Sequence, residues 1–211
     1  YAIYHDPYFH RAVYNLGTML YAHAEDMKHH TVSIPEELDT NRTYTLSGVY
    51  ICLASAMDPG VSIYKNSLSL VHHYLPLPNL FQGKLLISPQ GTEVGSHSSW
   101  EWHEMVVDAT ALRSKSGAGL EIPLSDMTLV EPGSDLSAPP GPAISITTPD
   151  GRNHYLIADS RVNANCWIDT LRLTHVLYAA GCSSNLARLL QPDPFLVPVV
   201  SPLSSPIKGS P

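Results

Sequence analysis

The sequence predicts an α+β fold in which a β-sheet is closed by a helix and preceded by a mainly helical region. Two short runs, 143–148 and 154–158, largely alternate apolar and polar residues, which is typical of strands. The turn signal Pro149-Asp150-Gly151 lies between them, so we expect a β-hairpin. A helical pattern follows the hairpin directly, and proline-rich sequence follows the helix.

The helix after the hairpin has a start signal, a buried face and an end signal. Asp159 or Ser160 can accept hydrogen bonds from the first free backbone N–H groups. Gly181 ends the helix, because glycine readily adopts the left-handed conformation that satisfies the last carbonyls. The spacing of three and four residues predicts one face turned toward the sheet, made of Ala164, Trp167, Ile168, Leu171 and His175.

Residues 1–80 form a different region. Apolar residues follow a helical stripe from Tyr8 to about His29. The segments 44–57 and 61–75 fit both a helical and a strand periodicity, so the pattern alone leaves both structures open. We favour a mainly helical region that packs against the sheet or precedes it.

The hairpin and its helix resemble the end of a pleckstrin-homology (PH) domain. The run 155–160, a six-residue spacer, and then Trp167, Ile168 and Leu171 are similar to the last strand and closing helix of that family. In that family a tryptophan of the helix plugs an open barrel. The resemblance covers about residues 82–181 and implies a partly open antiparallel β-barrel of about seven strands. It places five strands before the hairpin, at 83–88, 99–107, 111–116, 120–124 and 127–130.

We therefore expect three regions: a mainly helical region at 1–80, a PH-like domain at 81–181, and a proline-rich, disordered tail at 182–211. The start of the tail, 183–190, is also compatible with a helix, and its leucines can fold back on the domain.

Composition excludes several classes of partner and chemistry. The net charge of −7 argues against nucleic acid, whose binding depends on Lys and Arg neutralising phosphates. The three cysteines have no metal-ligand spacing and indicate reduced thiols of an intracellular protein. We expect a cytoplasmic protein, one that can lie at the periphery of a membrane or the cytoskeleton.

No motif indicates catalysis. The chain has neither a phosphate-binding glycine loop nor the glycine pattern of a nucleophile elbow. Adjacent histidines at 29–30 and 72–73 point in different directions, and no Cys or Glu completes a known metal spacing. We expect no enzymatic activity, no metal and no cofactor.

The PH resemblance also implies an anion site, which this sequence matches poorly. Phosphoinositide-binding members place a Lys on the first strand and a basic-x-Arg pattern on the second. Lys84 matches, but Glu101 and His103 occupy the two positions of the second strand. Residues 81–181 hold eleven acidic residues against six Lys and Arg. Phosphoinositide recognition is therefore disfavoured, and the residues left for lipid or anion contact are Lys84, His103, Arg113 and Lys115.

Trp100 and Trp102 alternate with Glu101 and so share one face of a strand. We favour a buried position for that face, and the alternative is an exposed anchor for a protein partner. The function that we expect is a non-catalytic scaffold or adaptor that binds a protein partner within a larger assembly. The alternative is a peripheral-membrane module with weak or atypical phosphoinositide binding, as the regulatory part of a larger signalling protein.

Overall fold

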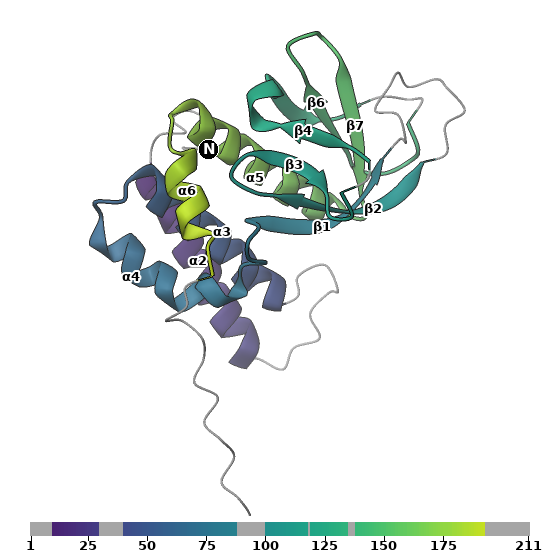
Figure 1. Ribbon diagram of the computed structural model, residues 1–211. Helices are drawn as coiled ribbons and strands as arrows, with labels where there is room; N and C mark the ends of the chain where they lie inside the picture. Colours follow the sequence, from purple (N-terminus) through teal and green to yellow (C-terminus); the bar gives the residue numbers. More distant parts are fainter. Residues whose placement is uncertain (1–9, 30–39, 88–99, 118, 135–137, 193–211) are drawn as a thin grey trace, which may run out of the picture.

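The computed structural model describes residues 10–29, 40–87, 100–117, 119–134 and 138–192. Helices pack beside a strongly curved sheet (Figure 1). The helices before the sheet are α2 (His10–His29), α3 (Thr40–Met57), α4 (Ser62–Val71) and the short η1 (His72–Tyr74). The strands are β1 (Phe81–Ile87), β2 (Glu101–Val107), β3 (Ala111–Ser114), β4 (Glu121–Pro123), β5 (Leu129–Pro132), β6 (Ala143–Thr147) and β7 (Asn153–Ala158), with η2 (Leu124–Asp126) between β4 and β5. The helices after the sheet are α5 (Arg161–Ala179) and α6 (Ser183–Leu189).

The described part of the N-terminal region is mainly helical, as expected. The two ambiguous segments, 44–57 and 61–75, are α3 and α4 with η1. Helix α3 is buried around most of its circumference, and every residue from Ser47 to Ala56 is buried. A helix buried on all sides has no polar face, which is why its periodicity was ambiguous in the sequence.

Helices α2 and α3 approach closely at Gly17. The hydroxyl of Ser47 on α3 donates a hydrogen bond to the Gly17 carbonyl at 2.8 Å. A Cβ atom at position 17 would lie 2.7 Å from Cγ1 of Ile51 and 3.1 Å from its backbone nitrogen. Glycine is therefore required sterically at this crossing, because any side chain would push the helices apart.

The sheet has seven strands in the order β4-β3-β2-β1-β7-β6-β5, and every pair is antiparallel. The expected hairpin is β6 and β7, joined at a turn where Gly151 has φ +80°. Strand β1 pairs with β2 along its whole length but with β7 only over Leu85–Ile87. The sheet thus folds over on itself as a partly open barrel, with β4 and β5 as its free edges. The predicted α+β fold is confirmed.

Helix α5 closes the barrel as the sequence indicated. Its first turn is capped by the Ser160 hydroxyl, which accepts from the Asn163 N–H at 3.1 Å. Trp167 is 1% exposed, together with buried Ile168 and Leu171. The indole meets the Phe81 ring edge-on at 4.8 Å between centroids. This aromatic plug and its apolar neighbours fill the barrel interior.

The same helix also contacts the edge strand β5 and the turn η2 that follows the edge strand β4. Arg172 Nε donates to the Val130 carbonyl of β5 at 2.6 Å, and His175 Nδ1 donates to the Leu124 carbonyl beside β4 at 3.0 Å. Backbone groups at sheet edges otherwise invite pairing with another chain. Polar side chains of α5 therefore span the gap between β4 and β5.

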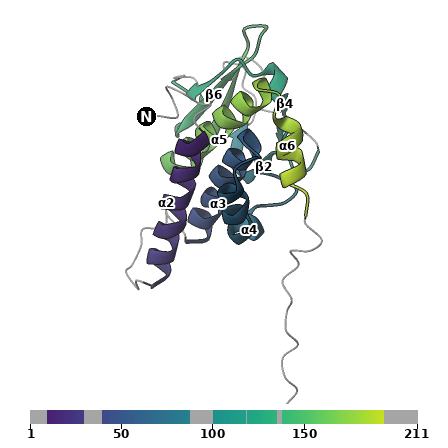
Figure 2. The same cartoon turned by 90° about the vertical axis from the view of Figure 1, so that its left-hand side faces the viewer.

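On its other side α5 packs against the N-terminal helices. Figure 2 shows α5 between the sheet and α3. The Tyr50 hydroxyl of α3 donates to Asp169 of α5 at 3.4 Å. Buried residues of α3, the sheet and α5 belong to one continuous apolar core. The division of the chain at 80 and 181 stays a prediction, but the two regions meet across a shared interior.

Residues 183–189, placed in the disordered tail, instead form the helix α6. Leu186 and Leu190 are buried in the common core, and Asn185 Nδ2 donates to the Ala56 carbonyl at 3.2 Å. The expected disorder is wrong for these residues because burial of the leucines stabilises the helix. The prolines of the tail begin only at Pro192, after the helix has ended. Residues 193–211 lie outside the described part of the chain.

Replacing Gly17 by alanine should lower the free energy of unfolding by about 1–3 kcal/mol, because the added methyl group overpacks the α2–α3 crossing. Urea denaturation measures this change. Asn15→Ala is the matched control, since it places alanine at an exposed position of the same helix. A Gly17→Ala chain as stable as the Asn15→Ala control would contradict the close packing.

Candidate functional site

The predicted anion-site residues do not converge. In the β1–β2 register Lys84 lies opposite Glu104, whereas His103 lies opposite Leu85. Side chains alternate between the two faces of a sheet, so Lys84 and His103 project from opposite faces. Lys84 is exposed on the outer face, and His103 is half-buried on the inner face with its Nε2 atom 3.9 Å from a Glu101 carboxylate oxygen.

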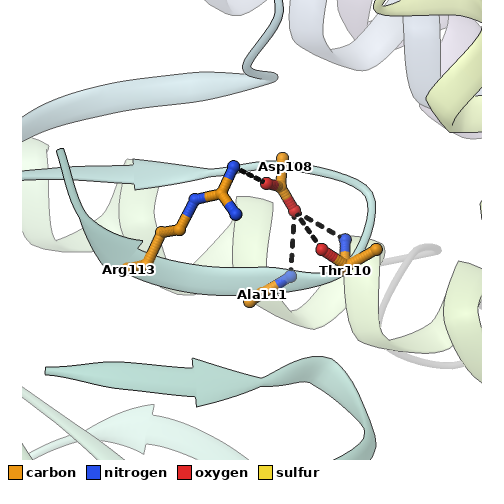
Figure 3. A network of polar contacts seen from close by, with 4 residues as sticks. All are labelled: Asp108, Thr110, Ala111 and Arg113. Carbon is orange, nitrogen blue, oxygen red and sulfur yellow. Dashed lines mark hydrogen bonds and ion pairs between the residues drawn. The ribbon is translucent and has the colours of Figure 1, made fainter. Parts of the chain in front are cut away.

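The guanidinium of Arg113 forms an ion pair with Asp108, which lies in the turn between β2 and β3. Nη2 of Arg113 lies 2.5 Å from Oδ2 of Asp108, while Oδ1 accepts from the Thr110 N–H and hydroxyl at 2.7 Å each and from the Ala111 N–H at 3.0 Å (Figure 3). Asp108 thus organises the β2–β3 turn and neutralises the guanidinium. Because its charge is already paired, Arg113 is a weak candidate for an anion ligand.

Lys115 lies on the same outer face as Lys84. Its Nζ atom is 3.5 Å from Oε1 of Gln82, a neighbour of Lys84 on the outward side of β1. Glu104 lies opposite Lys84 in the β1–β2 register. The outer face therefore carries lysines beside a carboxylate, and this mixed charge is a poor match for a polyphosphate.

Trp102 is exposed, with 52% of its surface accessible, so the buried position favoured for it is wrong. It lies opposite Leu86 on the outer face, because Met105 and Val107 fix the odd-numbered residues of β2 on the core side. Trp100 is half-buried just before the start of β2. The apolar residues at odd positions 105 and 107 indicate that the even-numbered Trp102 lies on the outer face. Val106, which is also apolar, breaks this alternation and makes the inward-facing positions ambiguous in the sequence.

Sequence reasoning missed a cleft of about 370 Å³ between the β4 edge and the β6–β7 turn. Its polar lining includes Glu121, Asp126 and Asp150, together with Arg152 and His154. Burial lowers the pKa of His154, so its imidazole favours the neutral form. Hydrogen bonds from the Thr148 hydroxyl and the Arg152 N–H lower the pKa of Asp150, which keeps this carboxylate ionised.

Of the two histidine pairs that the sequence offers, His72 has a structural role, and His30 lies outside the described residues. The imidazole of His72 is buried and donates through Nε2 to the Leu189 carbonyl of α6 at 2.6 Å. Within the described ranges, no group of three or more His, Cys, Asp and Glu side chains has the arrangement of a metal site. None of the helices in these ranges is long and apolar enough to span a bilayer.

Replacing Asp108 by alanine should destabilise the chain by about 1–3 kcal/mol, because three hydrogen-bond donors and a guanidinium lose their acceptor. Chemical denaturation tests this expectation. Asp126→Ala serves as the control, since Asp126 is exposed and accepts from the neighbouring Ser125 hydroxyl. Equal losses in the two variants would show that the Asp108 network contributes little.

No protein-family model matches the chain, and no curated protein matches it. A search of solved structures finds the PH domain of Slm1, solved in complex with phosphoserine, at 18% sequence identity and a TM-score of 0.34. The match covers 46% of this chain and 96% of that domain. The second half of the chain is a seven-stranded antiparallel barrel closed by the helix α5 with its buried Trp167, which is the arrangement that the sequence indicated.

Proposed function

We propose that this chain is a non-catalytic, PH-like scaffold or adaptor module that binds a protein partner through the outer face of β1 and β2. The observation that carries the proposal is the exposure of Trp102, a large aromatic side chain outside the core. Tryptophan is one of the residue types enriched among those that dominate binding energy at protein interfaces. In this proposal the module works without a cofactor.

The surroundings of Trp102 suit a protein interface. Leu86, half-buried across the strand pair, extends the apolar contact, and Lys84 and Glu104 flank it with charges of both signs. Such an arrangement of an aromatic centre with a polar rim is typical of protein-binding surfaces. Mixed charge at the rim selects a partner of complementary pattern.

The same face gives less support to recognition of a phosphoinositide headgroup. A polyphosphate needs several charge-assisted donors in one pocket. Here His103 is on the opposite face from Lys84, and Arg113 is paired with Asp108. Each missing charged hydrogen bond removes roughly 1.5–3 kcal/mol from such a site.

A peripheral-membrane module is the second candidate, because Lys84 and Lys115 lie on the outer face that also exposes Trp102. Tryptophan favours the boundary between lipid headgroups and acyl chains, and lysines are attracted to anionic lipid surfaces. Both candidates place the protein in the cytoplasm, in a larger assembly or at the periphery of a membrane or the cytoskeleton.

Trp102→Ala should reduce capture of the principal protein partner about 10-fold or more, because it removes the aromatic centre of the interface. Affinity capture with the whole chain, quantified by mass spectrometry, measures the loss. Stability should change by no more than about 0.5 kcal/mol, since the side chain is exposed. The matched control is Leu129→Ala, which truncates an exposed apolar residue on β5.

Liposome co-sedimentation separates the two candidates. The protein-binding proposal predicts no headgroup-dependent sedimentation of the wild-type chain with phosphoinositide vesicles. Salt-sensitive, headgroup-dependent binding that Lys84→Ala abolishes would overturn it in favour of the membrane module. If the Trp102→Ala chain captured every protein that the wild-type chain captures, the outer face of β1 and β2 would not be the binding surface.

A further inference from the structure

The edge strand β4 leaves part of its backbone open beside the cleft. The Leu120 carbonyl and the Leu124 N–H bond to the backbone of the β3 side, at 3.1 Å and 2.8 Å. Neighbouring residues of a strand direct their backbone groups to opposite sides, so Glu121 and Pro123 direct theirs away from β3. The Glu121 N–H and the carbonyls of both residues therefore lie on the open edge, where no other described residue bonds to them.

The open edge of β4 differs from the other edge of the sheet. The Val130 carbonyl of β5 accepts from Arg172, and the Leu124 carbonyl just after β4 accepts from His175. Helix α5 thus contacts β5 and η2, whereas residues 121–123 keep an edge that another strand can join. Since β4 is three residues long, backbone pairing alone gives a partner few hydrogen bonds, and a second contact has to add affinity.

The cleft between β4 and the β6–β7 turn has a net negative charge (Figure 1). Its lining holds three carboxylates, of Glu121, Asp126 and Asp150, and one guanidinium, of Arg152, so the net charge is −2. Nε of Arg152 lies 3.0 Å from Oδ2 of Asp150, and these two charges compensate each other. Arg113, opposite Glu121 on β3, is already paired in the β2–β3 turn. The cleft therefore repels phosphate groups and attracts a cation.

The rest of the lining suits one long basic side chain. Ile122, Pro123 and Pro149 supply apolar surface for its methylene stem, and the volume of about 370 Å³ has room for it. His154 also lines the cleft, and its Nδ1 atom is buried without a hydrogen-bond partner among the described residues. Buried polar atoms normally have a partner. In the tautomer with its proton on Nε2, this imidazole can accept from a donor that enters the cleft.

We propose that β4 and its cleft bind an extended basic segment of a protein partner. The segment pairs with the open edge of β4, and one arginine side chain enters the cleft, where its guanidinium meets Glu121 and Asp126. Arginine is preferred to lysine because its planar fork donates several hydrogen bonds to carboxylates. This surface is separate from the outer face of β1 and β2, so the inference does not depend on the function proposed for Trp102.

NMR titration of the whole isotope-labelled chain tests this surface. The probe is the peptide acetyl-Thr-Val-Arg-Val-Thr-amide, whose β-branched residues favour an extended conformation. The control peptide has citrulline in place of arginine, which keeps the shape and removes the charge. We expect the arginine peptide to shift the amide resonance of Glu121 saturably, and the citrulline peptide to bind at least about threefold more weakly.

Glu121→Gln should also weaken binding of the arginine peptide at least about threefold, because it removes a carboxylate of the cleft with little change in shape. Glu131→Gln is the matched control, since it removes an exposed carboxylate from the other edge strand, β5. Circular dichroism checks that both variants keep the fold.

Three results would overturn the proposal. One is the absence of a saturable shift at Glu121, or shifts confined to the β5 amides. Another is equal affinity for the arginine and citrulline peptides. The third is an affinity of the Glu121→Gln chain no lower than that of the Glu131→Gln chain.

Discussion

The position of α5 between the sheet and α3 is the constraint on which the rest of the structure depends. Trp167 fills the barrel from one side of α5, while Tyr50 of α3 meets Asp169 on the other. Truncation of a buried tryptophan typically costs about 3–5 kcal/mol, a large share of the about 5–15 kcal/mol that stabilises most domains. Arg172 donates to a carbonyl of the edge strand β5, and His175 donates to a carbonyl of η2, just after β4. One helix thus contacts the barrel core, both ends of the open barrel and the N-terminal helices.

The position of α5 also limits which surfaces of the barrel a ligand can reach. Because Trp167 and its neighbours occupy the barrel interior, ligands have access to the outer faces and the rims. The outer face of β1 and β2 presents Trp102 beside charges of both signs, and the β4 rim presents a small cleft lined by both polar and apolar residues. Neither surface gathers the basic donors that a polyphosphate site needs.

Local signals were sufficient to predict the hairpin and the closing helix. The Asp-Gly turn, the Ser160 cap and the spacing of Trp167, Ile168 and Leu171 act within about twenty residues, and all are confirmed. Features that depend on tertiary contacts were not predictable. Helix α3 has no polar face because it is surrounded, α6 folds because its leucines find the common core, and the cleft joins segments distant in sequence. The exposure of Trp102 could in principle be predicted from the alternation of β2. Three consecutive apolar residues at the end of this strand, however, made it ambiguous which residues face the core.

The central claim is that the barrel and the N-terminal helices share one core and unfold together. All three tryptophans lie in the barrel half, so their fluorescence reports on that half, whereas most helical residues measured by far-UV circular dichroism belong to α2, α3 and α4. Urea unfolding of the whole chain followed by both signals should give coincident transitions with the same midpoint and slope. Two separated transitions, with ellipticity lost while tryptophan fluorescence stays native, would contradict the account.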